Sequence, residues 1–435
     1  MVTDFKLSKF FYPIKILNYK RFLNKSNNFS ISDLRTYQYQ KLKSLIKYAY
    51  EFVPYYKKLF NSLKLLPKDI RSINDLNIIP PLTKEIVRER FKDLTSSIIK
   101  KLVPSLCNTS GSTGTPLSFY VDKNITICKF AIFWRIWEWE GYKFGQRWAN
   151  ITGPVFEDKR ILKYIRSLNA LYISSFDITK KNAETILLEL LKFKPKMLRG
   201  YPSSICEFAK FIGEKSLLRK IKVNCIATSS ENLLEFQREF LENVFDCKVF
   251  DNYSQWEQSC IIAECEKQQK HHQMEYGILE LLDENNELVK EGEIGEITGT
   301  NLENLAMPLL RYKTRDLAVK SNETCECGRS HDVIKVIDGR IEDIILTPDG
   351  RRIGRMDAAF KYNKGFDFAQ IIQNELNSID ILLVKNKLYN DEEKNILEKH
   401  IRDRVGNFLN INYIFVDRIK PGNNGKIRFV INNMH

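Results

Sequence analysis

The stretch from Thr109 to Pro116 reads TSGSTGTP and carries hydroxyl groups and glycines but no charge. Gly111 and Gly114 permit positive φ angles and a close approach of the backbone to a ligand. Backbone N–H groups together with hydroxyls form a nest suited to a polyphosphate, with an ordinary polar turn as the alternative. The lysine of a Walker A loop is missing. The residues predicted to bind phosphate are Thr109, Ser110, Gly111, Ser112, Thr113 and Gly114.

Cysteines and histidines form a second cluster with possible chemistry. Cys265 is followed by His271 and His272, and a later segment reads CECGRSH, with Cys325 and Cys327 in a Cys-x-Cys-Gly turn. Three cysteines with one histidine, or four cysteines, would suit a closed tetrahedral structural zinc site. Cys260 and His331 compete for places in it, and the choice between His271 and His272 stays open. The alternative is a set of scattered reduced cysteines.

Five further segments follow the glycine-rich loop, and most of their polar residues have an ordinary surface interpretation when taken singly. The segments are SSEN (229–232), DNYSQWE (251–257), LLRYKTRDLAV (309–319), DGRIEDIILTPDG (338–350) and PGNNGKIRFVI (421–431). Taken in order with TSGSTGTP, they resemble the motifs of the adenylate-forming superfamily, which includes acyl-CoA synthetases, peptide-synthetase adenylation domains and luciferases. The resemblance covers most of the chain.

The resemblance implies a role for each motif. Ser230 and Glu231 would lie along adenine together with Asp251, Asn252 and Tyr253. Three departures from the usual motifs are Ser254 and Arg315 in place of glycine and Glu342 at the hinge. The remaining implied roles are Glu257 as the Mg²⁺ ligand, Asp316 on the ribose hydroxyls, Arg340 on ribose or phosphate, and Lys426 on the carboxylate and α-phosphate.

The sequence gives only weak signals for the pocket that would bind the carboxylic acid. The resemblance places it among the aromatic helix at 131–142, TGPVF at 152–156 and GYPSS at 200–204, although an aromatic helix is more often part of a core. The predicted lining residues are Trp134, Trp137, Gly200, Tyr201 and Pro202.

The lead-in LKSLIKYAYEFVPYYKKLF and the segment MLRGYPSSICEFAKFI resemble the phenylacetate–CoA ligase-like branch. Within that branch the chain is most similar to adenylating proteins found with capsular-polysaccharide biosynthesis. The same branch has a zinc-binding insertion, which the cysteine spacing resembles. The small domain departs from typical phenylacetate ligases, so CoA, an amine and a sugar all remain as acyl acceptors.

Composition limits the classes of function. The 435 residues carry a net charge of +14, but 68 basic residues are offset by 54 acidic ones and the lysines are scattered, which does not favour nucleic acid. The sequence contains no run of about 20 apolar residues, so no membrane span is predicted. The N-terminal segment lacks the features of a signal peptide. Its lysines and aromatic residues could touch a membrane surface, although a solvated arm is preferred. Nine cysteines, mostly single among apolar residues, favour the reduced environment of the cytoplasm.

The elements that must position these residues follow from periodicity. Residues 33–63 predict a helix broken at Pro54, Thr83 can cap the next helix, and residues 125–142 predict a buried aromatic helix. Alternating strand and helix patterns over 150–255 predict an α/β sheet, and 277–320 a β-subdomain. The predicted fold is a large α/β domain of several sheets (1–340, zinc insertion at 260–331) and a small mobile α+β domain (341–435) carrying Lys426.

The sequence therefore predicts an ATP-dependent ligase. It would use Mg-ATP to convert a carboxylic acid to its acyl-adenylate with release of pyrophosphate, then pass the acyl group to an acceptor. The preferred setting is surface-polysaccharide biosynthesis. The alternative is a non-catalytic nucleotide-binding or scaffold protein of the polysaccharide assembly machinery.

Overall fold

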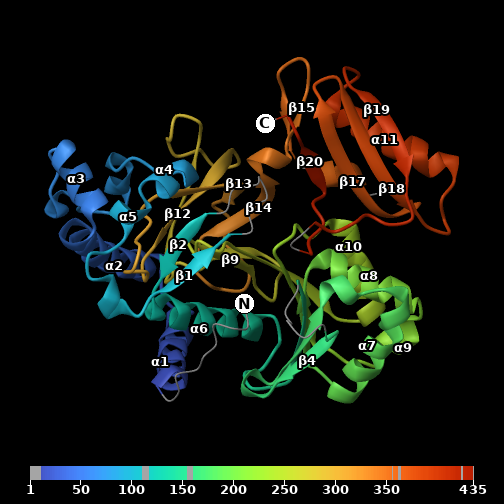
Figure 1. Cartoon of the computed structure of the whole chain (residues 1–435), viewed down its shortest axis with the longest axis horizontal. Helices are drawn as coiled ribbons and strands as arrows, with labels where there is room; N and C mark the ends of the chain where they lie inside the picture. Colours follow the sequence, from blue (N-terminus) through green and yellow to red (C-terminus); the bar gives the residue numbers. More distant parts are fainter. Residues whose placement is uncertain are drawn as a thin grey trace. The chain divides into compact units, whose positions relative to one another are not determined.

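The computed structural model describes residues 11–109, 117–153, 160–354, 356–360, 364–422 and 425–434 (Figure 1). The chain divides into two compact units, each built from two separate stretches. Unit 1 contains Met1–Phe144 and Asn252–Ile337, and unit 2 contains Gly145–Asp251 and Asp338–His435. Strands β8 (Lys248–Ser254) and β14 (Val333–Arg340) carry the chain from one unit to the other.

The N-terminal part of unit 1 is helical. Ser30 and Asp33 form a capping box at the start of α2, and α3 begins at Pro54, where the break in the helix was predicted. Thr83 caps α4 by accepting a hydrogen bond from the N–H of Ile86. The helical segments are α1 (Phe11–Ser26), α2 (Ile31–Phe52), α3 (Pro54–Ser62), η1 (Pro67–Asp69), η2 (Asn74–Ile78), α4 (Lys84–Glu89), α5 (Phe91–Leu94) and η3 (Ile99–Leu102).

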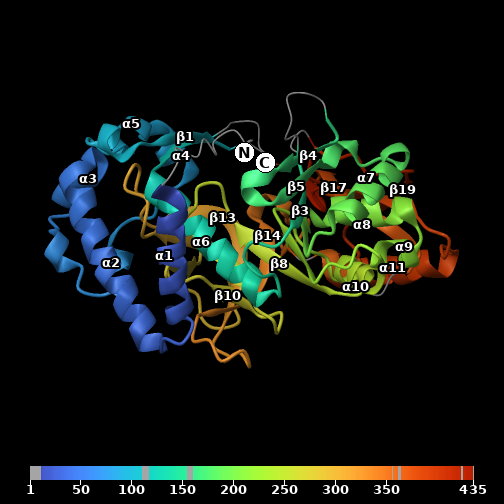
Figure 2. The ribbon, with the colours of Figure 1, turned by 90° about the horizontal axis from the view of Figure 1, so that it is seen from below.

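The aromatic helix is α6 (Lys123–Trp139), and it is largely buried as predicted. Asp122 caps it through the N–H of Ile125, and Gly141, at φ +100°, follows its end. Helix α1 lies beside α6 (Figure 2). This packing encloses Arg135, whose side chain is fully buried.

The strands of unit 1 form one part of the large sheet, in the order β11-β12-β13-β14-β10-β9-β8. The pairs β11–β12, β12–β13, β14–β10, β10–β9 and β9–β8 are antiparallel. Alternate side chains can therefore reach a common core, which includes Ile262, Leu281 and Ile297. The strands are β9 (Ile261–Glu264), β10 (Lys270–His272), β11 (Gly277–Leu282), β12 (Ile294–Asn301) and β13 (Tyr312–Ser321), with a separate hairpin of β1 (Ser105–Asn108) and β2 (Ser118–Val121).

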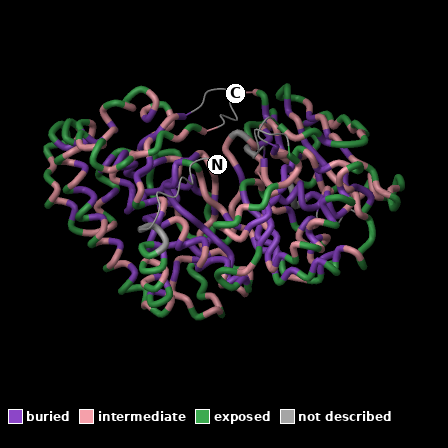
Figure 3. Tube along the Cα trace, turned by 60° about the horizontal axis from the view of Figure 1, so that its bottom comes forward, coloured by how far each residue is buried: buried purple, intermediate pink, exposed green. Residues whose placement is uncertain are grey.

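The first stretch of unit 2 is the predicted alternation of strands and helices. Strands β5, β3, β6 and β7 run parallel, with β4 antiparallel at the edge. Helices α7, α8 and α10 share an apolar core with the sheet. Figure 3 colours the chain by how far each residue is buried, with buried residues in purple. The elements are β3 (Trp148–Thr152), β4 (Leu162–Ile165), η4 (Arg166–Leu168), β5 (Ala170–Ser174), η5 (Ser175–Asp177), α7 (Lys180–Phe193), β6 (Met197–Gly200), α8 (Pro202–Ile212), α9 (Lys215–Arg219), β7 (Cys225–Ser229) and α10 (Glu235–Phe245).

The C-terminal stretch of unit 2 is the smaller α+β domain that was predicted. Its sheet has the order β19-β18-β17-β20, and α11 packs on it through Leu397, Ile401 and Val405. The segments are η6 (Ile341–Asp343), β15 (Ile345–Leu346), β16 (Arg352–Ile353), η7 (Met356–Phe360), β17 (Phe366–Glu375), β18 (Ser378–Lys385), α11 (Asp391–Val405), β19 (Asn410–Phe415) and β20 (Val430–Asn432).

The fold class is thus α/β, with a large multi-stranded sheet and a smaller C-terminal domain. The boundary between 340 and 341 stays a prediction, since the residues on its C-terminal side share unit 2 with Gly145–Asp251. Within the described ranges, no helix has the length and apolar character needed to cross a bilayer.

Candidate active site and metal centre

Thr109, the first residue of the predicted phosphate loop, closes the β1–β2 hairpin. Its N–H donates to the carbonyl of Leu117 at 2.9 Å, and its Oγ1 accepts from the N–H of Leu117 at 2.9 Å. The other loop residues, Ser110, Gly111, Ser112, Thr113 and Gly114, lie outside the described residues. Their role in phosphate binding stays a prediction.

Two of the predicted nucleotide residues meet in unit 1. The phenol of Tyr253, on β8, donates to Oδ2 of Asp316, on β13, at 2.6 Å. Burial and the neighbouring Asp316 raise the pKa of Tyr253 well above its usual value, so the phenol keeps its proton. Gln255 donates from Nε2 to the same phenol oxygen at 2.6 Å. These bonds fix the orientation of Tyr253 and Asp316 toward each other.

The predicted Mg²⁺ ligand, Glu257, lies next to the same strand. Its Oε1 accepts from the phenol of Tyr312 at 2.9 Å, and its side chain is almost completely buried. The backbone on both sides of Tyr312 is bonded to Leu82: the N–H of Leu82 donates to the carbonyl of Arg311, and the N–H of Lys313 donates to the carbonyl of Leu82. Burial and Glu257 raise the pKa of Tyr312, which therefore remains a donor to the carboxylate.

The two departures from glycine behave differently. Arg315 has a φ of +69°, in the left-handed region where glycine is favoured, and its N–H donates to Oε1 of Glu296 at 2.9 Å. This backbone explains why glycine is the usual residue here, and an arginine tolerates it at a cost of about 1 kcal/mol. Ser254 ends the extended strand β8, so its position does not require glycine.

The remaining adenine candidates are divided between the units. Asn252 is buried in unit 1 and donates from Nδ2 to Oε1 of Glu140 at 2.8 Å, and Asp251 precedes it on β8. In unit 2, Ser230 has a φ of +74° directly after β7. Glu231 follows it and is held by Ser203 at the start of α8.

The predicted lysine lies in unit 2 near residues of two other motifs. The Nζ of Lys426 is 5.6 Å from the ring centroid of Tyr201. The N–H of Ile427, the next residue, donates to Oε1 of Glu231 at 2.6 Å. Arg340 ends β14, and the preceding Gly339 (φ +92°) approaches Asn232 of the SSEN segment. Unit 2 therefore brings together Lys426, Tyr201 and Glu231.

Apart from Tyr201, the predicted acid-pocket residues pack against neighbouring protein groups, and Trp134 is only half-buried. The Trp134 ring contacts Phe144 edge-on at a centroid distance of 4.3 Å, and Trp137 is buried against Tyr142. Gly200 leaves no space for a side chain, because a Cβ there would lie 2.5 Å from the carbonyl oxygen of Ile151. Pro202 begins α8. A cavity of about 550 Å³ in unit 1 has a different lining: Asn24, Asn27, Arg135, Glu138, Trp139, Glu266 and Arg329.

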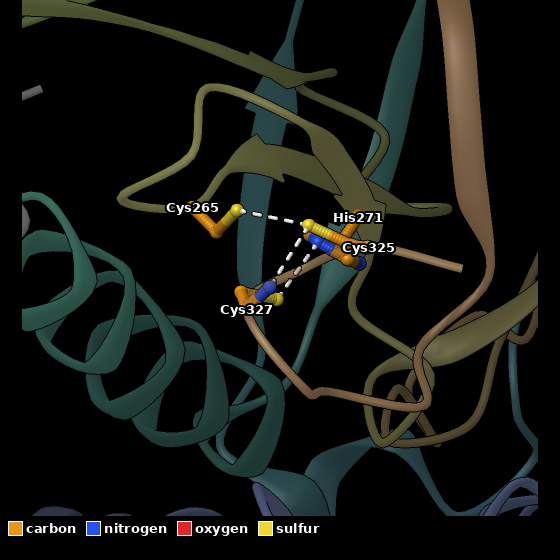
Figure 4. Close-up of side chains that lie close together, drawn as sticks. All are labelled: Cys265, His271, Cys325 and Cys327. Carbon is orange, nitrogen blue, oxygen red and sulfur yellow. Dashed lines mark hydrogen bonds between the residues drawn. The ribbon is translucent and has the colours of Figure 1, made fainter. Parts of the chain in front are cut away.

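Four side chains form a compact candidate metal centre (Figure 4). Cys265 follows β9, His271 lies on β10, and Cys325 and Cys327 come from the loop before β14. One ligand atom from each lies within 4.8 Å of all the others. The Cys265 and Cys325 sulfurs are 3.7 Å apart, and the Cys327 sulfur is 3.4 Å from Nε2 of His271.

This geometry fits zinc. Tetrahedral bonds of about 2.3 Å would hold two sulfurs about 3.8 Å apart. Nδ1 of His271 donates to the carbonyl of His331 at 3.3 Å, which leaves Nε2 free to bind a metal. Burial lowers the pKa of His271 to about 4, so the ring stays neutral as a ligand requires. Burial raises the pKa of Cys265 to about 12, so its thiolate needs a cation for stabilisation.

The other zinc candidates lie elsewhere. His272 is fully buried and is not among the four residues whose ligand atoms lie together. Adjacent residues of a strand point to opposite faces, which is why only one of the two histidines reaches the cluster. The Cys260 sulfur accepts from Gln255, and Nε2 of His331 contacts Glu275 at 3.0 Å.

Comparisons with known proteins find similar sequences along nearly the whole chain. Residues 345–433 match the family model of the CapK C-terminal domain. The chain is 26% identical over 417 residues to protein CapK of Staphylococcus aureus, covering 93% of this chain and 90% of the relative. It is 25% identical over 431 residues to a phenylacetate–coenzyme A ligase of Thermus thermophilus, covering 92% and 96%. The chain is thus similar, over more than nine tenths of its length, to CapK and to a phenylacetate–coenzyme A ligase.

The chain also shares its fold with a solved CoA ligase. A 2-hydroxyisobutyryl-CoA ligase, in its postadenylation state with an acyl-AMP, superposes with a TM-score of 0.77 at 19% identity. The superposition covers 94% of this chain and 92% of that one. The predicted fold is thereby confirmed, and the relatives named above agree with the predicted branch.

Three contacts in the structure were not predicted from the sequence. They are the pairing of Tyr312 with Glu257, the bond from Gln255 to Tyr253, and the hold of Glu231 on the backbone beside Lys426. Tyr312 lies in the segment 309–319 and Gln255 in the segment 251–257, so the hydrogen-bond donors of both side chains could have been predicted to lie near the site. The third contact joins residues 196 positions apart, and no local pattern indicates it.

Proposed function

We propose that this ligase activates a carboxylic acid with ATP, giving an acyl-adenylate and pyrophosphate. The observation that carries the proposal is the hydrogen bond between Tyr253 and Asp316. It joins residues 63 positions apart, and the motifs assign them to the adenine and the ribose of one nucleotide. A carboxylate that accepts from ribose hydroxyls makes charge-assisted hydrogen bonds, which are the strong ones.

The chemical step brings two anions together, so positive charge must compensate the α-phosphate. Lys426 suits this role because its ammonium is a compact cation on a flexible stem. Glu257 and the nearby loops would hold Mg²⁺, which supplies charge neutralisation on the phosphate oxygens. Arg340, at the end of β14, would add a second cation near ribose or phosphate.

CoA is the preferred acyl acceptor. Relatives are phenylacetate–CoA ligases, and the solved neighbour has also been captured with acyl-AMP and CoA together. An amine or sugar in surface-polysaccharide assembly is the second candidate. The match of 345–433 to the CapK C-terminal domain favours it, because this is the part that would meet the acceptor when Lys426 withdraws.

The four-residue metal centre is proposed as a structural zinc site. Its ligands tie the turn after β9 to the loop before β14, which brings parts of unit 1 distant in sequence into one cluster. Three cysteines and one histidine complete a tetrahedral set, and catalytic zinc sites instead keep an open position.

A pyrophosphate-release screen tests the proposed activity. The protein is incubated with Mg-ATP and a panel of aryl, amino and uronic acids, each with and without CoA. At least one acid should stimulate release above background, and added CoA should raise the turnover if CoA is the acceptor. Folded protein that responds to no acid would favour the scaffold alternative.

A further inference from the structure

Glu231 makes a set of hydrogen bonds that its expected place beside adenine does not explain. Oε2 accepts from the N–H of Ser203 at 3.1 Å, and Oε1 accepts from the Ser203 hydroxyl at 3.0 Å. Oε1 also accepts from the N–H of Ile427 at 2.6 Å. One carboxylate therefore joins the first turn of α8 to the C-terminal segment.

The bonded amide belongs to the residue directly after the predicted catalytic lysine. A bond at the Ile427 N–H fixes the peptide plane that Lys426 shares with it. The turn is also fixed from within, since the N–H of Gly422 donates to the carbonyl of Lys426 at 2.9 Å. Glu231 and the charge of Lys426 also attract each other, which lowers the pKa of the carboxyl against the effect of burial.

Gly425 provides a second anchor on the other side of Lys426. It has a φ of +76°, and a Cβ there would lie 2.8 Å from Oγ of Ser175 and 2.9 Å from the ring of Phe176. The backbone before Lys426 therefore packs closely against η5, and the N–H directly after it donates to Glu231. Because Gly425 and Ile427 are both held, the position of the Lys426 backbone is fixed, and its side chain extends over the ring of Tyr201.

We propose that Glu231 is a positioning residue, which holds the Lys426 turn in place for formation of the acyl-adenylate. The inference rests on the proposed function and deepens it. It assigns Glu231 a role through the backbone of the C-terminal segment, distinct from contact with adenine. Because the second half-reaction does not need Lys426 at the α-phosphate, loss of this contact should impair adenylation selectively.

Other bonds between α8 and the C-terminal domain provide matched controls. Lys210 donates to the carbonyl of Asp367 at 2.7 Å, and Arg418 Nε lies 2.8 Å from Oε1 of Glu207. Both bonds hold the same domain to the same helix without touching the Lys426 turn. Glu207→Ala therefore tests whether any loosened docking produces the effect expected of Glu231→Ala.

The first experiment needs no substrate. Amide hydrogen exchange of the peptide containing Ile427 is followed by mass spectrometry in the wild type, Glu231→Ala, Glu231→Gln and Glu207→Ala. Exchange at this peptide should be at least about tenfold faster in Glu231→Ala, because a bond to a charged acceptor is lost. Glu231→Gln keeps one carbonyl oxygen and should be intermediate, and Glu207→Ala should match the wild type there.

The second experiment measures the half-reactions separately, with an acid found active in the release screen. Glu231→Ala should lower kcat for adenylation at least about tenfold while the KM for ATP changes less than about twofold, because the lost interaction acts in the transition state. Transfer from the purified acyl-adenylate to the acceptor should keep the wild-type rate. Glu207→Ala should keep wild-type kcat in both half-reactions.

The outcomes separate the two claims. Unchanged exchange at Ile427 in Glu231→Ala, or a raised KM for ATP with kcat intact, overturns the positioning role. An equal loss of adenylation in Glu207→Ala also overturns it, since docking alone would then explain the effect. A wild type silent with every acid contradicts the proposed function, and hydrogen exchange still decides whether Glu231 holds the turn.

Discussion

At the scale of single residues, Glu231 makes three hydrogen bonds that hold the fold locally, while its burial disfavours the ionised form of its carboxylate. Burial raises its pKa to about 6 from the usual 4.5, even though the N–H of Ile427, Ser203 and the charge of Lys426 all lower it. Between these two values the folded chain binds more protons than the unfolded chain. The stability of the wild type therefore falls as the pH rises from about 4 to 7.

Glu231→Gln should remove this dependence. The difference in the free energy of unfolding between the wild type and the variant should shift by up to about 2 kcal/mol between pH 4 and pH 7.5, in favour of the variant at the higher pH. Urea unfolding at the two pH values measures the shift. A constant difference would mean that Glu231 ionises in the folded protein as it does in an unfolded chain.

Asp316 provides a second prediction at this scale. Asp316→Asn keeps an oxygen that can accept from Tyr253 but removes the charge offered to the ribose hydroxyls. The KM for ATP in the adenylation assay should rise about 10- to 100-fold, the range expected for a lost charged hydrogen bond. The exposed Asp391→Asn, at the start of α11, serves as the control. An unchanged KM would remove Asp316 from the nucleotide site.

At the scale of elements, a buried ionic cluster joins α1, α6 and the turn before β11. Arg135 donates to both carboxylate oxygens of Glu275, at 2.5 and 3.0 Å, and to Gln273 at 2.5 Å. Burial alone would raise the pKa of Glu275, but Arg135 and His331 hold it well below its usual value. Ser26, at the end of α1, donates to the same carboxylate.

Arg135→Met should destabilise the fold strongly, because it leaves Glu275 buried without its cation. The expected loss is about 3–5 kcal/mol in the free energy of unfolding. The matched control is Lys58→Met, which breaks the exposed pair of Lys58 and Asp93 (3.4 Å) and should cost less than about 1 kcal/mol. Similar losses in the two variants, measured by urea unfolding, would show that the cluster adds nothing beyond a surface pair.

The order and type of the elements followed from local signals. Pro54 begins α3 because its ring suits the first turn of a helix, and Thr83 caps α4 with its hydroxyl. Alternating periodicity gave the strands and helices of residues 150–255. The candidate site was predictable only as a list of residues. The motifs show which residue types occur and in what order along the chain, but they do not show the distances between the side chains in the fold.

What could not be predicted depends on long-range packing. Arg135 lies in a helix whose apolar pattern predicts only a place in the hydrophobic core, and its partner Glu275 is 140 positions away in the sequence. The choice of His271 over His272 depends on which face of β10 points toward the loops that carry the cysteines. The segment KHH is too short for its sequence pattern to show which of the two histidines lies on that face. The grouping of 338–435 with 145–251 likewise follows from contacts rather than composition.

At the scale of the whole molecule, the metal centre is expected to stabilise unit 1. Protein purified without added zinc should contain about one zinc per chain by elemental analysis, and a chelator should lower its melting temperature, since bound metal contributes to folding stability. Cys325→Ser should reduce the zinc content, and Cys107→Ser, on β1, should not. A zinc content below about half an equivalent in folded wild type contradicts a structural zinc site.

The proposed reaction forms an acyl-adenylate with Lys426 at the reacting phosphate. Exchange of labelled pyrophosphate into ATP, dependent on an added carboxylic acid, measures this step alone and needs no acceptor. Wild type should catalyse the exchange with at least one acid, and Lys426→Ala should reduce it at least about 100-fold while remaining folded, in line with the loss of one preorganised charge. Exchange that is absent with every acid, or equal in Lys426→Ala and wild type, would contradict acyl-adenylate formation through Lys426.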